Sequence, residues 1–142
     1  MTKVEINIHI NRPPDQVFAY ISNPENNPQW QGGMREATIT STGPLGVGST
    51  YVQVASFLGR RIESHFEIVE YEPGHLIKGK TITGTFPITF TRTVESADPG
   101  SHVSALITGQ PTGIFRLLGP LLDKMVESSV KKDYANLKRI ME

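Results

Sequence analysis

The chain opens on a run of residues that alternate between apolar and polar. Val4, Ile6, Ile8 and Ile10 are apolar, and the residues between them are polar. This period of two is typical of a strand that has one buried face and one solvated face. We therefore predict a first strand that turns its isoleucines and valine toward a core.

Two short helices are predicted after this strand. Pro14 and Asp15 suit the first turn of a helix, because proline lacks an N–H there and an acidic side chain complements the positive helix end. Asn23, which precedes a second proline, is the expected N-cap of the next helical turn. We expect the Asn27-Pro28 pair to close this segment before Trp30.

The middle of the chain alternates again and is divided by turns rich in glycine and proline. Connections this short favour antiparallel neighbours, because parallel strands need long crossovers. Together with the first strand, the pattern predicts a seven-stranded antiparallel sheet. The six further strands are expected at roughly 34–42, 49–57, 60–71, 75–82, 85–96 and 102–110.

The last thirty residues change to a helical period and predict a long amphipathic helix that covers the sheet. Gly119-Pro120 is expected either to kink this helix or to delay its regular start. No repeat or linker divides the chain, so we expect residues 1–142 to form one α+β domain. The residues predicted to face the sheet are Phe115, Leu118, Leu122, Val126, Ser129, Val130, Leu137 and Ile140.

Hairpin pairing predicts which side chains share the inner face of the sheet, because directly opposed residues point the same way. If the turn at Leu58-Gly59 has an even number of residues, Tyr51 opposes Phe66 and Gln53 opposes Ser64. An odd number would reverse the facing of residues 51–57. By the same argument, the inner face of the later strands carries Ile77, Gly79, Thr81, Phe86, Ile88, Phe90, Val103, Ala105 and Ile107, while Lys78 and Lys80 point outward.

Two charged features invite a chemical interpretation. Arg92 continues the inner series and could hold a carboxylate or phenolate of a ligand, but we favour a guanidinium that extends to water near the strand end. His65 alternates with Glu63 and Glu67 on the opposite face, where a solvated sheet surface is the simpler interpretation. We assign no catalytic residue.

Composition narrows the classes of function. Fourteen basic and fourteen acidic residues cancel, so no net field favours nucleic acid. There is no cysteine, no signal-like segment and no apolar run that could span a membrane, which predicts a cytoplasmic protein without integral membrane association. The four histidines lack paired spacing, and no phosphate loop or nucleophile elbow occurs, so neither a metal nor a cofactor is expected.

The order of these elements and several motifs resemble the START-like helix-grip fold, in particular the polyketide cyclase/dehydrase and lipid-transport group known as SRPBCC. The resemblance spans nearly the whole chain and implies a curved sheet that grips the long helix around a deep apolar cavity. Its motifs are residues 10–18, residues 21–24 through Trp30, the Gly-rich segment 43–48, residues 67–73 and the closing segment 137–142.

The resemblance also implies a ligand-binding set within the inner face, although we expect more than half of the inner apolar residues simply to pack the core. Residues 112–115 are the expected mouth of the cavity. The predicted ligand-binding residues are Trp30, Tyr51, Gln53, Ser64, Phe66, Phe86, Phe90, Arg92, Phe115, Leu118 and Leu122.

Three functions fit these features. The leading hypothesis is a protein that binds a hydrophobic small molecule such as a lipid, polyketide or aromatic metabolite. The second is a polyketide cyclase or dehydratase with a proton relay through Tyr51, Gln53, Ser64 or Arg92; aromatase/cyclases of this fold are thought to use an inner-strand arginine, and Ile68 stands at that position here. The third is an interaction module that uses the outer sheet face. The sequence leaves the ligand and the oligomeric state open.

Overall fold

The computed structural model of the protein describes residues 2–57, 59–84, 87–110 and 119–142. Within these ranges, strands and helices alternate as the sequence predicts, and the predicted strand positions agree to within a few residues at either end. No helix of the described chain is long and apolar enough to cross a membrane. The elements are β1 (Thr2–Ile10), α1 (Pro14–Ile21), the 3₁₀ turn η1 (Pro24–Asn26), α2 (Asn27–Trp30), β2 (Met34–Ile39), β3 (Thr50–Phe57), β4 (Arg60–Glu72), β5 (Leu76–Gly84), β6 (Ile88–Ser96), β7 (Ser101–Gly109) and α3 (Gly119–Met141).

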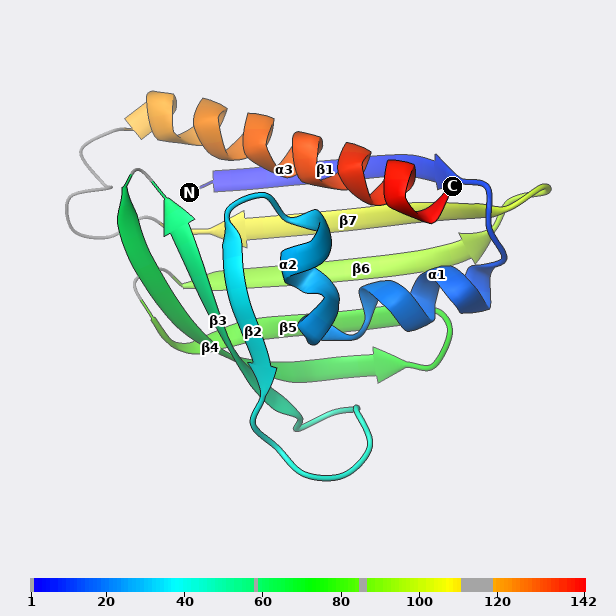
Figure 1. Cartoon of the computed structure of the whole chain (residues 1–142), viewed down its shortest axis with the longest axis horizontal. Coiled ribbons are helices and arrows are strands. Elements are labelled where there is room, and N and C mark those ends of the chain that lie inside the picture. Colours follow the sequence, from blue (N-terminus) through cyan, green and yellow to red (C-terminus); the bar gives the residue numbers. More distant parts are fainter. Residues whose placement is uncertain (1, 58, 85–86, 111–118) are drawn as a thin grey trace.

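The described strands form one antiparallel sheet in the order β1-β7-β6-β5-β4-β3-β2. Strands β2 to β7 are joined in sequence as neighbours, and β1 pairs with β7 at the far edge. In Figure 1, α3 runs beside β1, while α1 and α2 lie in front of the middle strands. All three helices therefore lie on the same side of the sheet.

The sheet is strongly bent along β4. The pairing of β4 with β5 shifts register between His65 and Phe66 and again between Ile68 and Glu70. Extra residues of this kind bend a strand and increase its twist. As a result, β2 and β3 run at a steep angle to β6 and β7 (Figure 1). This bend makes the inner face of the sheet concave.

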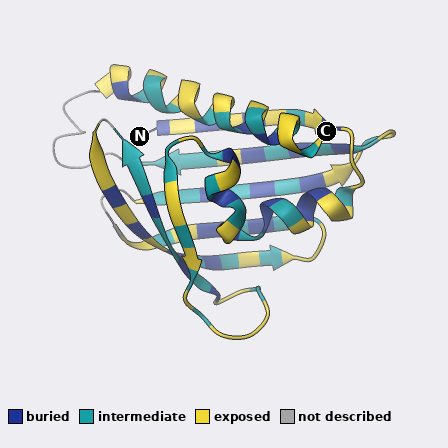
Figure 2. Cartoon of the chain, in the orientation of Figure 1, coloured by how far each residue is buried: buried dark blue, intermediate teal, exposed yellow. Residues whose placement is uncertain are grey.

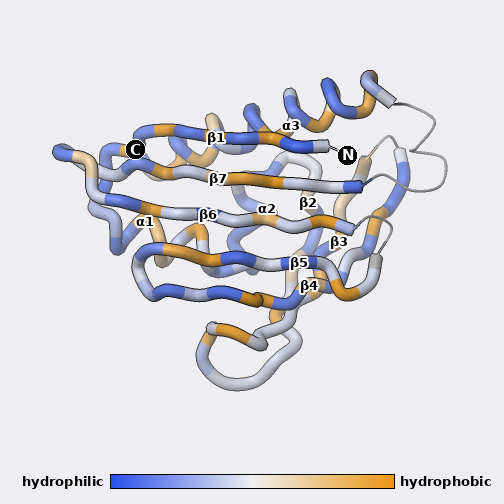
Figure 3. The backbone as a smooth tube through the Cα atoms, turned by 180° about the vertical axis from the view of Figure 1, so that it is seen from behind, coloured by the Kyte–Doolittle hydropathy of each residue, from blue (hydrophilic) through white to orange (hydrophobic). Residues whose placement is uncertain are grey.

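Alternation along the strands gives the sheet one buried face and one solvated face. Val4 and Ile6 of β1 are buried while Lys3 and Glu5 between them are exposed, as predicted. Burial alternates similarly along β4, β6 and β7 (Figure 2), and from behind polar and apolar residues alternate along the strands (Figure 3).

The first helices confirm one local prediction and correct another. The Asn23 side chain accepts a hydrogen bond from the backbone N–H of Glu25 at 3.1 Å, so Asn23 is the predicted N-cap. Asn27-Pro28 does not close the segment; it begins α2, because proline is tolerated in the first turn of a helix. Trp30 ends α2 and is fully buried.

The described helix α3 starts at Gly119 and agrees with the predicted amphipathic pattern at most positions. Leu122 and Leu137 are buried, but Ile140 is 41% exposed, so its predicted packing against the sheet is wrong. Tyr134, which the helical pattern did not select, is a buried residue of α3. Phe115 and Leu118 lie outside the described residues.

The inner face leaves no room for a side chain at Gly79 of β5. A Cβ atom built there would lie 2.6 Å from the ring of Phe90, which is itself buried. We expect Gly79→Ala to lower the free energy of unfolding by about 1–2 kcal/mol, because overpacking outweighs the reduced chain entropy of the unfolded state. Urea denaturation of both proteins measures this difference.

Gly46→Ala is the matched control for that substitution. A Cβ at Gly46 meets nothing within 4 Å, and its backbone needs no left-handed conformation. We expect its free energy of unfolding to stay within about 0.5 kcal/mol of the wild type. Equal midpoints for the two variants would contradict the tight contact between Gly79 and Phe90.

Candidate functional site

A cavity of about 220 Å³ lies between α3 and the sheet, and its described lining comes from every strand except β5. Its walls are mostly apolar, and the residues of α3 that border it come from the first half of the helix. The described residues that line it are Thr2, Met34, Gln53, Ala55, Phe57, Ile62, Ser64, Phe66, Ile88, Ile107, Gly109, Gln110, Leu122, Val126, Ser129 and Val130.

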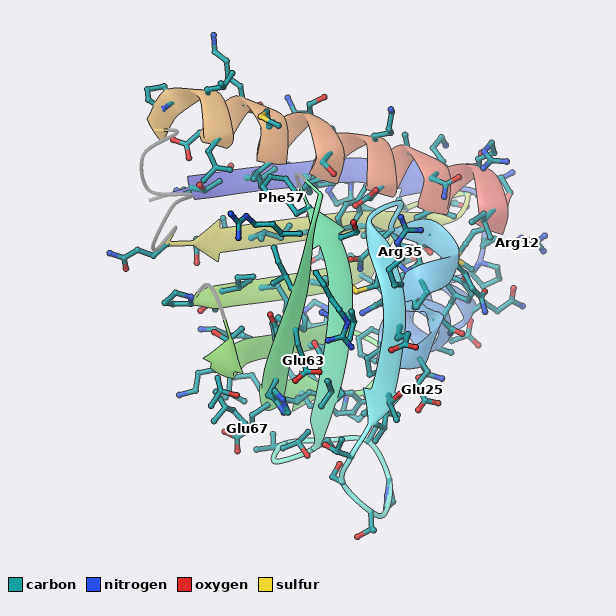
Figure 4. All side chains as sticks on the ribbon, turned by 60° about the vertical axis from the view of Figure 1, so that its left-hand side comes forward. Arg12, Glu25, Arg35, Phe57, Glu63 and Glu67 are labelled. Atoms are coloured by element: carbon teal, nitrogen blue, oxygen red, sulfur yellow. The ribbon has the colours of Figure 1, made fainter. Side chains whose placement is uncertain are left out.

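The register between β3 and β4 determines which of their side chains enter this cavity. Tyr51 pairs with Phe66, Gln53 with Ser64 and Ala55 with Ile62, as an even-numbered turn predicts. Phe57 at the end of β3 packs with Ile62 and Leu122, and Figure 4 shows Phe57 beneath α3. The β3–β4 hairpin therefore forms one wall of the cavity, and α3 covers it.

Gln53 and Ser64 bring polar atoms into this apolar wall. The Nδ2 of Asn27 donates a hydrogen bond to Oε1 of Gln53 at 2.6 Å, which fixes the carboxamide of Gln53. Ser64 is only 5% exposed. Neither the Ser64 hydroxyl nor the amide nitrogen of Gln53 has a hydrogen-bond partner among the described residues.

A second buried cluster fills the other half of the concave face around Arg92. The Nε of Arg92 donates to the hydroxyl of Tyr134 at 2.9 Å, and its Nη1 donates to the carbonyl of Ile21 at 3.4 Å. The guanidinium carbon lies 4.7 Å from the ring centre of Phe90 and 5.1 Å from that of Trp30. Aromatic faces and neutral oxygens thus surround the cation, with no carboxylate paired to it in the described chain.

This cluster corrects the prediction that Arg92 extends to water. The side chain is 7% exposed, because three helices supply partners that the strand pattern alone does not reveal. Arg92 also does not line the cavity. Its donors are directed at Tyr134 and Ile21.

Tyr51 lies between the two halves of the inner face. It is buried, and its ring stacks on Phe66 with centres 5.2 Å apart. Burial raises the pKa of the Tyr51 phenol well above its ordinary value, and the nearby charge of Arg92 opposes this rise only in part. A phenol held neutral in this way is a poor general base at neutral pH.

The structure divides the predicted ligand-binding residues into three groups. Gln53, Ser64, Phe66 and Leu122 line the cavity. Trp30, Tyr51, Phe90 and Arg92 instead belong to the buried cluster beside it. The remaining predicted residues, Phe86, Phe115 and Leu118, lie outside the described residues, as does the expected mouth at 112–115.

Some cavity residues were not selected from the sequence. Val126 and Val130 were assigned only to the helix stripe, and Ala55 follows Gln53 on the same face of β3; all three line the cavity. Met34 and Phe57 were not singled out at all, because no pairing argument applied to the ends of their strands.

The outer face of β4 agrees with its predicted solvated character. Glu63 and His65 are exposed and lie 3.5 Å apart, and Figure 4 shows Glu63 and Glu67 on this strand. Arg61 also contacts Glu63 at 3.8 Å. Within the described ranges, no three acidic or histidine side chains gather closely enough to hold a metal ion.

A protein-family model described as "Polyketide cyclase / dehydrase and lipid transport" matches residues 1–142. The chain belongs to this family. The family is associated with hydrophobic small molecules, and its fold agrees with the helix grip seen here. No curated protein matches the sequence well enough to count as a relative.

Solved structures share the fold of this family member at low sequence identity. A START superfamily protein from Mycobacterium smegmatis is 13% identical with a TM-score of 0.85, covering 99% of this chain and 97% of its own. TTHA0849 from Thermus thermophilus is 19% identical with a TM-score of 0.83, over 96% and 94%. Major latex-like protein 151 from Panax ginseng is 14% identical with a TM-score of 0.74, over 99% and 97%.

The buried phenol of Tyr51 predicts a loss of stability in alkali. Its pKa is higher in the folded than in the unfolded chain, so the unfolded chain loses the proton first as the pH rises. The contribution is constant below about pH 10 and costs about 1.4 kcal/mol at pH 11. Urea unfolding of the wild type and Tyr51→Phe at pH 8 and pH 11 measures this cost.

We expect Tyr51→Phe to resemble the wild type at pH 8, because the described residues form no hydrogen bond with the Tyr51 hydroxyl. At pH 11 the variant should lose about 1.4 kcal/mol less of its free energy of unfolding than the wild type. An equal alkaline loss in both proteins would contradict the raised pKa of Tyr51.

Proposed function

We propose that this protein binds a hydrophobic small molecule in the cavity between the sheet and α3. The observation that carries the proposal is the chemistry of the lining: aliphatic and aromatic side chains from five strands and one helix surround a small number of polar groups. This makeup is usual for small-molecule sites. Membership in the cyclase, dehydrase and lipid-transport family supports the same class of ligand.

The volume sets the size of the first ligands to test. An apolar cavity of about 150 Å³ holds benzene, so about 220 Å³ suits a molecule on the order of ten non-hydrogen atoms. Bicyclic hydrocarbons and their simple derivatives have this size. At about 0.5–0.8 kcal/mol per atom, such ligands would bind with a Kd between about 200 and 1 μM.

The lining favours binding over the cyclase or dehydratase alternative. No aspartate, glutamate, histidine, lysine, arginine or tyrosine is among the described residues that line the cavity. General acid–base chemistry needs a titratable group within hydrogen-bond reach of the reacting atom. Of the relay residues considered from the sequence, only Gln53 and Ser64 reach the cavity, and neither titrates near neutral pH.

Methyl NMR tests the proposal at the site itself. We expect tetralin, a bicyclic hydrocarbon of ten carbon atoms, to shift the methyl resonances of Ile62, Ile107 and Val126 and to leave those of Val47 unchanged. The first three line the cavity, whereas Val47 is an exposed loop residue. Shifts confined to surface methyl groups would overturn the proposed binding site.

Filling the cavity should abolish binding. In Ala55→Phe the new ring enters the space opposite Ile62, so we expect at least a tenfold loss of affinity for tetralin by calorimetry. Ser56→Phe places the same ring on the other face of β3 and should bind like the wild type.

Ser129→Phe repeats the test from the side of α3, because Ser129 also borders the cavity. If Ala55→Phe fails to fold, Ser129→Phe still tests whether the ligand binds in this cavity. Full affinity in folded Ala55→Phe and Ser129→Phe would contradict binding in this cavity.

A further inference from the structure

The polar side chains that border the cavity differ in whether they are available to a ligand inside it. The hydroxyl of Thr2 donates to the carboxylate of Asp123, and Gln110 and Ser129 are exposed at the rim. Ser64 is buried, and Gln53 is half-buried directly opposite it in the register. Gln53 and Ser64 are therefore the polar pair of the cavity interior.

The hydrogen bond from Asn27 determines what Gln53 offers to a ligand. Asn27 is 2% exposed, and its Nδ2 donates to Oε1 of Gln53, which leaves the amide nitrogen of Gln53 without a partner in the described chain. The Ser64 hydroxyl stands across the strand pair from it without a protein partner in the described chain. Two hydrogen-bond donors thus lie at directly opposed positions of an otherwise apolar wall.

The charges around the cavity restrict what these donors can bind. None of the described lining residues is ionisable, and the guanidinium of Arg92 is bound to Tyr134 and Ile21 outside the cavity. Among the described lining residues a carboxylate ligand would find no counter-charge, and burial without one is strongly unfavourable. A pure hydrocarbon would leave the donors of Gln53 and Ser64 covered and unpaired, which is also unfavourable.

We propose that the Gln53–Ser64 pair selects neutral apolar ligands that carry one acceptor oxygen, such as a ketone, over both the matching hydrocarbon and the matching carboxylate. The amide nitrogen of Gln53 and the hydroxyl of Ser64 donate to that oxygen, while the remaining walls contact the hydrocarbon frame. This inference rests on the proposed function and names the class of ligand that the same cavity takes.

Three ligands of one shape test the selection: tetralin, 2-tetralone and tetralin-2-carboxylate at pH 7.5. The measured quantity is the ratio of the Kd of tetralin to that of 2-tetralone, determined by calorimetry for each protein. Comparison of this ratio between proteins cancels the different hydrophobicity of the two ligands. We expect Ser64→Ala to lower the ratio about tenfold, the value of one hydrogen bond.

Gln53→Leu is the second variant and should lower the ratio by a similar factor. Ser56→Ala, on the outer face of β3, is the control and should keep the wild-type ratio. In the wild type we expect the carboxylate to bind at least tenfold more weakly than the ketone. A second readout is the amide NH₂ resonance of Gln53, which should shift with 2-tetralone and not with tetralin.

The outcomes separate this inference from the proposed function. Tetralin and 2-tetralone could both bind with the same ratio of Kd values in the wild type, Ser64→Ala and Gln53→Leu. The polar pair would then select nothing, and this inference would be overturned while the proposed function stands. Carboxylate affinity equal to that of the ketone would also overturn it. If none of the three ligands binds the wild type, the proposed function fails and the inference fails with it.

Discussion

One buried guanidinium connects the sheet to all three helices. Arg92 belongs to β6; it donates to Tyr134 of α3 and to the carbonyl of Ile21 at the end of α1, and it lies over Trp30 of α2. A buried cation without a carboxylate is unfavourable unless its surroundings replace the lost water. The two hydrogen bonds and two aromatic faces do so only when the three helices occupy their observed positions, so Arg92 makes the placement of each helix depend on the others.

The same arrangement explains why the concave face is filled at one end and hollow at the other. The second half of α3 contributes Tyr134 and Leu137, and α1 and α2 add Phe18 and Trp30 to the same core. The first half of α3 faces Ala55, Ser64 and Gly109, which are small, and no side chain of α1 lines that space. Size differences along one helix and one sheet thus divide a continuous inner face into a packed cluster and a cavity.

Strand and helix positions were predictable because they depend on periods of two and 3.6 residues that are local in sequence. The facing of Gln53 and Ser64 was predictable for a similar reason, since a short hairpin fixes register. The burial of Arg92 was not, because the strand pattern places it inward but cannot show that Ile21, Trp30 and Tyr134 converge on it. Asn27 was missed likewise, since its bond to Gln53 joins segments that are distant in the sequence.

The cavity has a cost that bears on its role. Space left unfilled between a helix and a sheet lowers the stability of a fold roughly in proportion to its volume. The whole free energy of unfolding of a domain is only about 5–15 kcal/mol. Larger side chains at Ala55 or Ser64 would occupy part of this space. A fold that keeps small residues there, and that packs the opposite end around Arg92, leaves room for the hydrophobic ligand that we propose.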